Sequence, residues 1–257
     1  MQILYATEPT PGHANEDVVI TGPTWAIVLD GASARPGTDT GRIHDVPWFV
    51  QHLGTELARR LTNASAAQLD DALAEAITAT RQLHEHTCDL SNPESPSATV
   101  VAIRGRDDQL DYLTLADSPL IVDVDGQVRA IADDRTAHLT DYSHEGVRAA
   151  RNTPDGFYVA STMPEAAYQA IRGTLPTPQV RRAALLSDGA ARLVERFRVV
   201  NWQKLLELLH ADGPTELIRR TRDAELAETD AERATRRGKK HDDATAVLVT
   251  RLQRATA

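Results

Sequence analysis

The sequence predicts an α+β fold built on antiparallel sheets. Three strand-like runs come before the first helical pattern, two helical patterns then follow one another directly, and four more strand-like runs come next. Strands and helices therefore do not alternate as they do in a doubly wound parallel sheet. Turn residues at 105–108 and 125–126 connect consecutive strand-like runs, which is typical of a meander. We expect the helices to cover the sheets from outside.

Each predicted strand is a run of β-branched or apolar residues with Gly, Pro or Asp at its ends. Some runs alternate between apolar and polar residues, and others are apolar throughout, as strands covered on both faces are. In chain order, the predicted strands are 2–6, 17–21, 24–30, 98–104, 110–116, 119–124, 127–131, 157–161, 182–187 and 244–251.

The predicted helices show apolar residues at helical spacing and suitable residues at their ends. Residues 63–65 can cap the second helix, Pro47 and Pro164 stand in first turns, and Gly238 follows the last helix. The predicted helices are 47–61, 65–90, 164–171, 190–197, 202–210 and 214–234.

Composition limits the classes of function. The 257 residues are 41% hydrophobic and contain no Pro/Ser/Gly-rich linker, so we expect a single domain over 1–257. The net charge of −9 argues against nucleic acid or an anionic membrane as the main partner. A single cysteine, Cys88, excludes an internal disulfide and a thiolate metal cage. With no membrane-spanning run and no signal-peptide pattern, a cytoplasmic location is expected.

Acidic residues border several of the predicted strands. Two apolar runs each lead into an Asp-Gly pair, and other acids directly precede or separate strands. Asp-Gly is also a frequent turn pair, so a turn is the alternative explanation for each pair by itself. The acids at strand ends are Asp17 with Glu16 before it, Asp30, Asp117, Asp188, and Asp242 with Asp243 after it.

Several carboxylates at one rim of a sheet repel one another unless cations neutralise them. Oxygen ligands without Cys, and without a convincing pair of His residues, select Mg²⁺ or Mn²⁺ over Zn²⁺. Two such ions about 3.5–4 Å apart lower the pKa of a bridging water and clamp a phosphoryl group for in-line attack. The chemistry indicated is hydrolysis of a phosphoester.

Six motifs, in this order, resemble those of the metal-dependent protein serine/threonine phosphatases of type 2C. The resemblance implies a four-layer α/β/β/α sandwich with two central antiparallel sheets, a binuclear Mg²⁺ or Mn²⁺ centre at one edge, and phosphoprotein substrates. The motifs are Asn15-Glu16-Asp17, Asp30-Gly31, Ser95-Pro96-Ser97-Ala98, Ala116-Asp117-Ser118, Ser187-Asp188-Gly189 and Asp242-Asp243.

The resemblance also implies a role for each acid. Asp30 would bridge both ions, and the Gly31 carbonyl would bind one of them. Asp17, Asp188 and Asp242 would hold the second ion, directly or through water. Asp117 matches a position that contributes, with Asp188, to a third and looser metal site in bacterial members. Glu16 is the alternative to Asp17, and Asp243 is the rival of Asp242.

The motifs depart from the family at substrate-handling positions. Gly12 stands where bacterial relatives carry an Arg that grips the substrate phosphate. His13, beside it, is a candidate to replace that Arg or to donate a proton, and simple exposure to solvent is the alternative. The missing Arg motivates a second hypothesis, a catalytically silent member that serves as a regulatory or binding module. A haloacid-dehalogenase-like phosphatase ranks lower because Ala32 occupies the place of its second Asp.

A basic run precedes the last predicted strand. Residues 233–241 read RATRRGKKH, which allows either a phosphoprotein-binding surface or a solvated helix end. Lys and Arg stabilise the C-terminus of a helix through its dipole, so the sequence favours the solvated helix end.

Overall fold

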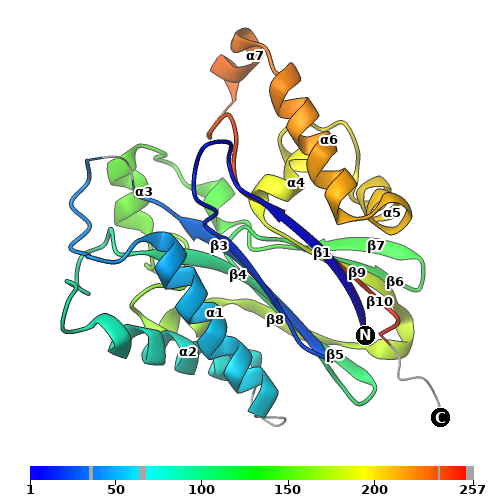
Figure 1. Cartoon of the computed structure of the whole chain (residues 1–257), viewed down its shortest axis with the longest axis horizontal. Coiled ribbons are helices and arrows are strands. Elements are labelled where there is room, and N and C mark those ends of the chain that lie inside the picture. The colour runs from blue at the N-terminus through cyan, green and yellow to red at the C-terminus, as the bar shows by residue number, and fades with distance from the viewer. Residues whose placement is uncertain (35–36, 64–67, 237, 253–257) are drawn as a thin grey trace.

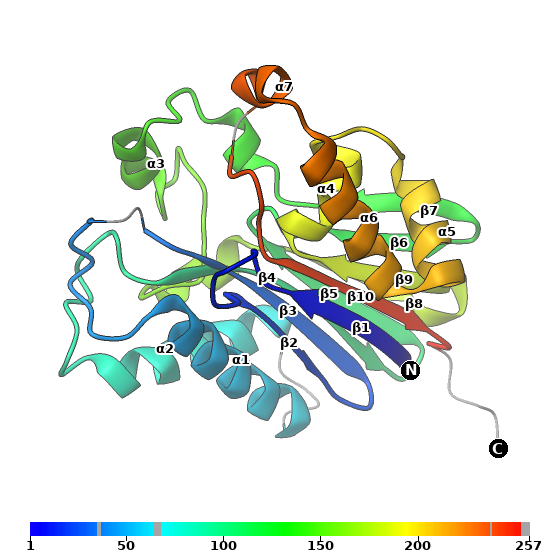
Figure 2. The same cartoon turned by 45° about the horizontal axis from the view of Figure 1, so that its top comes forward.

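Two five-stranded antiparallel sheets lie face to face, with helices on both outer sides (Figure 1; Figure 2). This computed structural model describes residues 1–34, 37–63, 68–236 and 238–252. The architecture confirms the predicted α+β sandwich of four layers. The first sheet has the order β1 (Gln2–Glu8), β10 (Ala244–Thr250), β9 (Val180–Leu186), β6 (Leu120–Val124), β7 (Gln127–Ile131). The second has the order β2 (Asp17–Thr21), β3 (Trp25–Ala32), β4 (Ser97–Arg106), β5 (Gln109–Leu115), β8 (Ile171–Pro176).

The helices form the two outer layers and one end of the molecule. The pair α1 (Val46–Asn63) and α2 (Leu69–His84) covers the second sheet, whereas α4 (Asp188–Glu195), α5 (Trp202–Asp212) and α6 (Pro214–Ala227) cover the first. Two short helices, α3 (His144–Ala150) and α7 (Asp230–Thr235), lie at the same end of the sandwich (Figure 1). Short 3-10 helices are η1 (Arg135–His138), η2 (Pro164–Gln169) and η3 (Thr177–Gln179).

Strand β3 shows how the layers are built from a continuous apolar run. Its residues alternate in direction, as in any β-strand. Trp25, Ile27 and Leu29 belong to the core that the second sheet shares with α1 and α2. Ala26 and Val28 belong to the core between the two sheets. Asp30 follows Val28 by two residues, so it continues the inter-sheet face and lies where that face reaches the rim.

Two predicted elements between 144 and 176 differ from the structure, and two elements there, α3 and β8, were not predicted. The strand predicted over 157–161 is wrong, because Phe157 and Ala160 form only isolated bridges, to Arg151 and Ala98. The helix predicted over 164–171 is a 3-10 helix that ends at Gln169, and the edge strand β8 follows it. Helix α3 was not predicted. Its residues are all exposed or half-buried, so no apolar stripe indicates a helix there.

Two predicted helices are shorter than the sequence pattern indicates. Helix α2 ends at His84 instead of continuing to 90, and the predicted cap at 63–65 extends into 64–67, outside the described residues. The helix predicted over 214–234 is two helices, because Glu228 is extended and Thr229 is the N-cap of α7. Thr229 and Glu232 form a capping box, in which each side chain accepts from the backbone N–H of the other residue.

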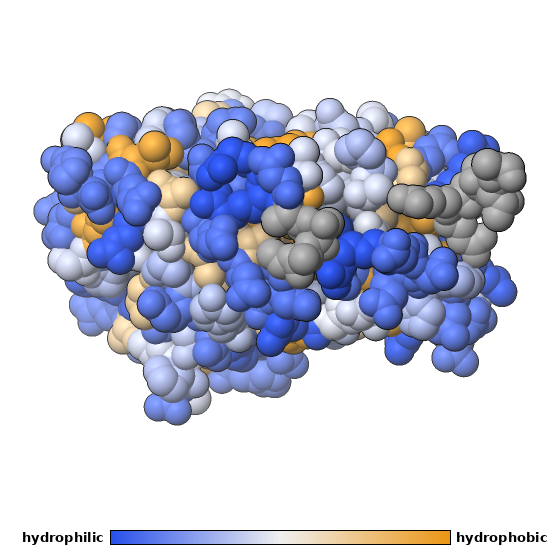
Figure 3. Space-filling model, turned by 90° about the horizontal axis from the view of Figure 1, so that it is seen from below, coloured by the Kyte–Doolittle hydropathy of each residue, from blue (hydrophilic) through white to orange (hydrophobic). Residues whose placement is uncertain are grey.

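Most hydrophobic side chains are buried in the cores that these layers create. Figure 3 shows one face of the molecule as largely hydrophilic, with hydrophobic residues scattered over it. Scattered apolar residues are normal on a protein surface, so this face presents no evident apolar patch. Within the described ranges, no helix combines the length and the apolarity that crossing a bilayer requires.

Candidate active site

Strand pairing brings the first two acids together at the rim between the sheets. Asp17 of β2 lies directly opposite Asp30 of β3 in the antiparallel register. Val19, two residues after Asp17, packs into the inter-sheet core, so Asp17 and Asp30 share the inter-sheet face. On the other side of Asp30, Thr99 of β4 is its register partner. Two carboxylates therefore stand side by side at the mouth of the sandwich.

The first sheet completes the rim from the opposite side. Asp188 is the first residue of α4, and its backbone N–H donates to Asp30 Oδ2 at 3.3 Å. The N-terminus of a helix carries unsatisfied N–H groups and a partial positive charge, which favours the nearby carboxylate. This hydrogen bond joins residues 158 positions apart in sequence. It therefore links the two sheets at the acidic rim.

The two Asp-Gly pairs are sites of close backbone approach and not turns. Gly31 lies within β3 and Gly189 within α4. A Cβ atom on Gly31 would meet the Glu16 carbonyl oxygen at 2.6 Å, and one on Gly189 would meet the Asp243 carbonyl oxygen at 1.9 Å. Glycine therefore allows neighbouring segments to pack against the chain directly after each acid. The turn explanation that Asp-Gly allows does not hold at either position.

Asp17 is a rim acid whose buried carboxylate lacks hydrogen-bond partners among the described residues. The residue is 5% exposed. Burial raises its pKa to about 8, and the negative charges of Asp243 and Asp188 add to this. The hydroxyls of Thr245 and Ser187 lower the pKa, although neither meets hydrogen-bond geometry to Asp17. A carboxylate in this environment requires a proton or a cation.

The other rim acids shift in the same direction. Desolvation raises the pKa of Asp30 well above its ordinary value, and the charges of Asp17, Asp188 and other acids raise it further. Desolvation also raises the pKa of Asp188 to about 7, with contributions from Asp242 and Asp117. The mutual influence of these groups means that segments far apart in sequence bring their charges close together.

The adjacent acids Asp242 and Asp243 have different surroundings. Asp243 is buried, and its two oxygens accept from the backbone N–H groups of Thr10 and Glu16, each at 2.6 Å. It therefore fastens the N-terminal loop. Asp242 lines a cleft and accepts from Arg192 at 2.9 Å and from Lys239 at 3.2 Å. Of the two acids, Asp242 is the one that faces the space beside the rim.

Asp242 is connected to a buried network of ion pairs. Glu225 of α6 is fully buried and accepts from Arg192 at 2.6 Å and from Arg222 at 2.9 Å. His241 Nδ1 lies 2.8 Å from the second Glu225 oxygen. Arg192 thus bridges Glu225 and Asp242, which fixes the position of the Asp242 carboxylate. This network was not predicted from the sequence, because helical spacing indicates which residues are buried but not their partners.

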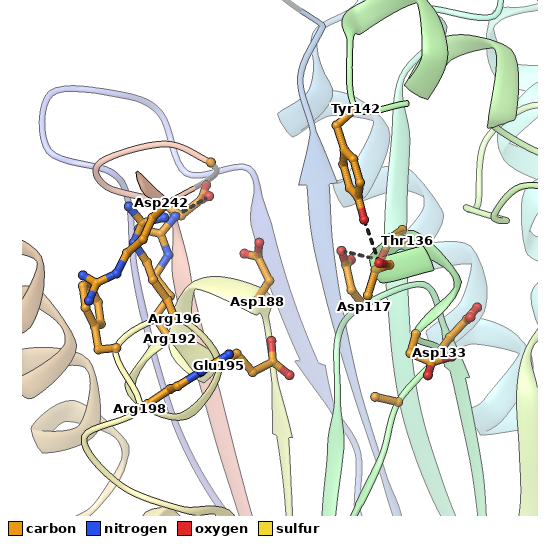
Figure 4. A pocket seen from close by; sticks show the side chains of 16 residues that line it. Asp117, Asp133, Thr136, Tyr142, Asp188, Arg192, Glu195, Arg196, Arg198 and Asp242 are labelled. Atoms are coloured by element: carbon orange, nitrogen blue, oxygen red, sulfur yellow. Dashed lines mark hydrogen bonds and ion pairs between the residues drawn. The ribbon is translucent and has the colours of Figure 1, made fainter. Parts of the chain in front are cut away.

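A cleft of about 910 Å³ opens beside the rim (Figure 4). Asp188 and Glu195 lie on one side of it, and Asp117 and Thr136 on the other. Partial desolvation raises the pKa of Glu195 to about 7 although the residue is open to solvent, and the charges of Asp188 and Asp117 contribute. Glu195 was not predicted as a site residue, because no strand end or motif marks it.

Asp117 is the acid that lines the cleft across from Asp188. Burial raises its pKa, whereas its own backbone N–H and the Thr136 hydroxyl, at 3.3 Å, lower it. The residue before it, Ala116, has φ +63°, a left-handed conformation that is uncommon for residues other than Gly. The Ala116 N–H donates to buried Asp133, which also pairs with Arg135. The strained turn is therefore held by its neighbours, and it directs Asp117 into the cleft.

The remaining predicted site residues lie around the rim. Gly31 continues β3 after Asp30, and its N–H donates to the Glu16 carbonyl. The Glu16 side chain is half-buried and accepts from the Ser33 hydroxyl, and burial raises its pKa. His13 is exposed in the loop between β1 and β2 and does not line the cleft. The roles given to Gly31, Glu16 and His13 stay predictions.

Comparison with known proteins identifies the class. The sequence profile described as protein phosphatase 2C matches residues 14–249. No curated protein matches the chain in sequence. Among solved structures, the serine/threonine phosphatase PstP/Ppp from Mycobacterium tuberculosis is 19% identical, with a TM-score of 0.59 over 96% of this chain and 97% of that one. Stp1 from Staphylococcus aureus is 14% identical, with a TM-score of 0.65 over 97% of this chain and 94% of that one. The phosphatase MsPP from Mycobacterium smegmatis, solved with cacodylate, is 17% identical, with a TM-score of 0.60 over 97% and 98%.

These matches define a metal-dependent protein serine/threonine phosphatase. The profile covers most of the sequence, so the chain belongs to the protein phosphatase 2C family. The predicted resemblance is confirmed, and family membership favours the phosphatase over a silent binding module. A PstP catalytic domain with a TM-score of 0.58 to this chain was solved in complex with two manganese ions. Dependence on divalent metal therefore agrees with the prediction from the acidic motifs.

Proposed function

We propose that the chain, acting as one catalytic domain over 1–257, hydrolyses phosphoserine and phosphothreonine esters in proteins with two Mg²⁺ or Mn²⁺ ions held at the acidic rim. Asp30 would hold both ions, and the Gly31 carbonyl would hold one of them. Asp17, Asp188 and Asp242 would hold the second ion, directly or through water. Asp117 and Asp188 would hold a third, looser ion.

The buried carboxylate of Asp17 is the observation that carries this proposal. Its two oxygens lack hydrogen-bond partners in the described part of the chain, and its pKa is raised to about 8. Its strand partner Asp30 also has a raised pKa. A buried acid without a partner is costly, and a cation removes that cost. The donors are hard oxygens, which suit Mg²⁺ or Mn²⁺.

The described residues fit ions that keep much of their water. Within the described ranges, no group of three or more Asp, Glu, His or Cys side chains is arranged to hold a metal ion by itself. Mg²⁺ usually retains several waters and is held through one or two carboxylates, so a pair such as Asp17 and Asp30 is sufficient. Water ligands then fill the remaining positions. When bound, the ions supply a nucleophilic water of lowered pKa and polarise the phosphoryl oxygen.

The chain's own residues position the reaction. The N-terminus of α4 and the Asp188 N–H orient the Asp30 carboxylate, and Arg192 orients Asp242. The cleft on the outer side of the rim receives the substrate side chain. Glu195, whose pKa is about 7, is open to this cleft and can exchange protons near neutral pH. His13 remains the candidate for the role of the missing phosphate-binding Arg or of a proton donor.

The ion and the location are also part of the proposal. Either Mg²⁺ or Mn²⁺ is compatible with an all-oxygen donor set. A cytoplasmic location is supported by the single cysteine and by the phosphoprotein substrates that the family implies.

Hydrolysis of p-nitrophenyl phosphate and of a phosphoserine peptide tests the proposal. The purified chain is assayed with EDTA, Mg²⁺ or Mn²⁺. We expect activity only with a divalent ion, and a fall of at least about 10³-fold in kcat/KM for Asp30→Asn. Asp125→Asn is the matched control, because Asp125 is exposed in the β6–β7 turn, where Asn also tolerates the left-handed backbone. Full activity of Asp30→Asn, or metal-independent hydrolysis, would contradict the proposal.

A further inference from the structure

The cleft is larger than one phosphorylated side chain requires. Its volume of about 910 Å³ lies near the upper end of the range for pockets that enclose a drug-sized ligand, roughly 300–1,000 Å³. Asp117, Asp188 and Asp242 line one part of it. The rest extends past the end of α4 to the loop that follows α7. A peptide therefore has room to place neighbouring residues beside the phosphorylated one.

Three arginines line this outer part of the cleft. Arg196 and Arg198 follow α4, and Arg236 follows α7. Figure 4 shows Arg196 and Arg198 on the side of Asp188, across from Asp117. A chain with a net charge of −9 thus gathers positive charge next to its acidic rim. We name Arg196, Arg198 and Arg236 the arginine wall.

Two members of the arginine wall are held in place by one buried acid. The Glu228 side chain is 1% exposed and accepts from Arg196 at 3.0 Å and from Arg236 at 2.9 Å. Burial opposes ionisation of Glu228, but these hydrogen bonds outweigh it and lower its pKa. The guanidinium carbons of Arg196 and Arg236 also lie over the Phe197 ring, 5.7 and 5.6 Å from its centroid. Groups fixed in advance lose little entropy when a ligand binds.

Arg198, the third member of the arginine wall, is exposed to solvent. It forms no ion pair with any residue that the structure describes. Its φ of +54° marks a reversal of the chain directly after α4. Among the acids that line the cleft, Glu195 is the one in the same segment as Arg196 and Arg198. The planar guanidinium group matches phosphate and carboxylate oxygens in pairs.

We propose that the arginine wall binds a second anionic group of the substrate, so that the preferred substrates are phosphopeptides with a further phosphate or with carboxylate side chains close to the reacting residue. The inference rests on the proposed function, because it assigns a substrate class to the same cleft. A polynucleotide is the less favoured anion, since a chain of this net charge repels a long polyanion.

Charge reversal at Arg198 tests the inference. Arg198→Glu is compared with the matched control Arg81→Glu, which changes an exposed arginine on α2, outside the cleft. Four substrates are used with Mn²⁺: p-nitrophenyl phosphate, a phosphoserine peptide with neutral neighbours, the same peptide with glutamates, and the same peptide with a second phosphoserine. Wild type is expected to prefer the two anionic peptides over the neutral one.

The expected result is selective. Arg198→Glu lowers kcat/KM by about tenfold or more for the two anionic peptides, and leaves p-nitrophenyl phosphate and the neutral peptide within about twofold. Arg81→Glu leaves all four unchanged. Equal losses on all four substrates, or none on the anionic peptides, would overturn the inference. A larger loss for the doubly phosphorylated peptide than for the glutamate peptide identifies phosphate as the preferred anion.

A binding measurement separates this inference from the proposed function. Fluorescence anisotropy reports the affinity of labelled, unphosphorylated glutamate peptide, which has no phosphoester to hydrolyse. Binding that weakens about tenfold in Arg198→Glu supports the arginine wall even when no substrate is hydrolysed, in which case only the proposed function fails. Tighter binding of a single-stranded oligonucleotide than of any peptide would contradict the choice of partner.

Discussion

Buried acids in two regions of this molecule have opposite surroundings. Asp111 of β5 is buried and pairs with Arg104 at 3.2 Å and with Arg106 at 2.6 Å. Glu225 likewise has Arg192, Arg222 and His241 around it. At the rim, Asp17 is as deeply buried as Asp111, yet its oxygens have no hydrogen-bond partner in the described residues.

The difference separates structural acids from functional ones. Leaving a buried charge unpaired costs several kcal/mol, so a chain that supplies arginines to Asp111 and Glu225 can provide cations where stability requires them. At the rim, burial raises the pKa of Asp30 and Asp188, and the neighbouring acids raise both further. In the proposed function, the cation at the rim comes from solution. The comparison predicts opposite responses to the loss of a charge in the two regions.

The largest expected effect is loss of activity on neutralising a rim acid. Asp188→Asn is expected to lower kcat/KM by about 10²–10³-fold, because a carboxylate that serves the metal centre is lost. Titration calorimetry with Mn²⁺ should show two binding events in wild type, weakened in the variant. Unchanged isotherms would show that Asp188 does not contribute to metal binding.

Neutralising a paired acid should affect stability instead. Glu225→Gln leaves Arg192 and Arg222 without their buried counter-charge, which costs about 3–5 kcal/mol. The Tm, followed by circular dichroism without metal, should fall by about 10 °C. A Tm equal to that of wild type would remove the distinction between the two regions.

The pH dependence of stability tests the raised pKa values of the rim acids. The raised pKa values of Asp17 (about 8) and Asp188 (about 7) mean that the folded, metal-free chain binds more protons than the unfolded chain above about pH 4. The stability of the metal-free protein therefore falls as the pH rises from about 5 to 8, by up to about 1.4 kcal/mol per pH unit for each group.

Thermal unfolding in EDTA between pH 5 and 9 measures this dependence. Asp17→Asn should flatten the profile, because its side chain no longer titrates, whereas Asp125→Asn should leave it unchanged. A wild-type Tm that rises steadily from pH 5 to 9 would contradict the raised pKa values of Asp17 and Asp188.

The smallest expected effect concerns the link between the two regions. Arg192 contacts both Glu225 and Asp242. Arg192→Lys keeps the charge but loses the planar fork that reaches both acids. We expect about a tenfold loss of Mn²⁺ affinity and a Tm within a few degrees of wild type, by analogy with changes to groups that orient metal ligands. Unaltered affinity would show that Asp242 needs no such support.

The acidic rim was predictable because its residues border recognisable strands. Apolar runs that end in Asp30 and Asp188 mark strands entering a common edge, and β-strand alternation explains why Asp17 and Asp30 share a face. The partners of Arg192 and the position of Glu195 were not predictable. They depend on how α4 and α6 pack against each other, which local sequence patterns do not encode.

The errors in the predicted elements have similar physical causes. Strand β8 lies at a sheet edge and is mostly exposed, so no apolar run reveals it. The break between α6 and α7 does have a local signal, the Thr229 and Glu232 capping box, which the apolar spacing over 214–234 obscured. The basic run over 233–241 starts in the last turn of α7, in line with the predicted helix end, and Arg236 just after the helix also lines the cleft.

Proton release on metal binding tests the central claim most directly. At pH 7 the pKa of Asp17, raised to about 8, keeps this carboxyl largely protonated without metal, and a divalent ion must displace that proton. Mn²⁺ titration calorimetry in buffers of different ionisation enthalpy gives the number released. The account predicts at least one proton per chain in wild type and fewer in Asp17→Asn. Binding of Mn²⁺ with no proton release at pH 7 would contradict it.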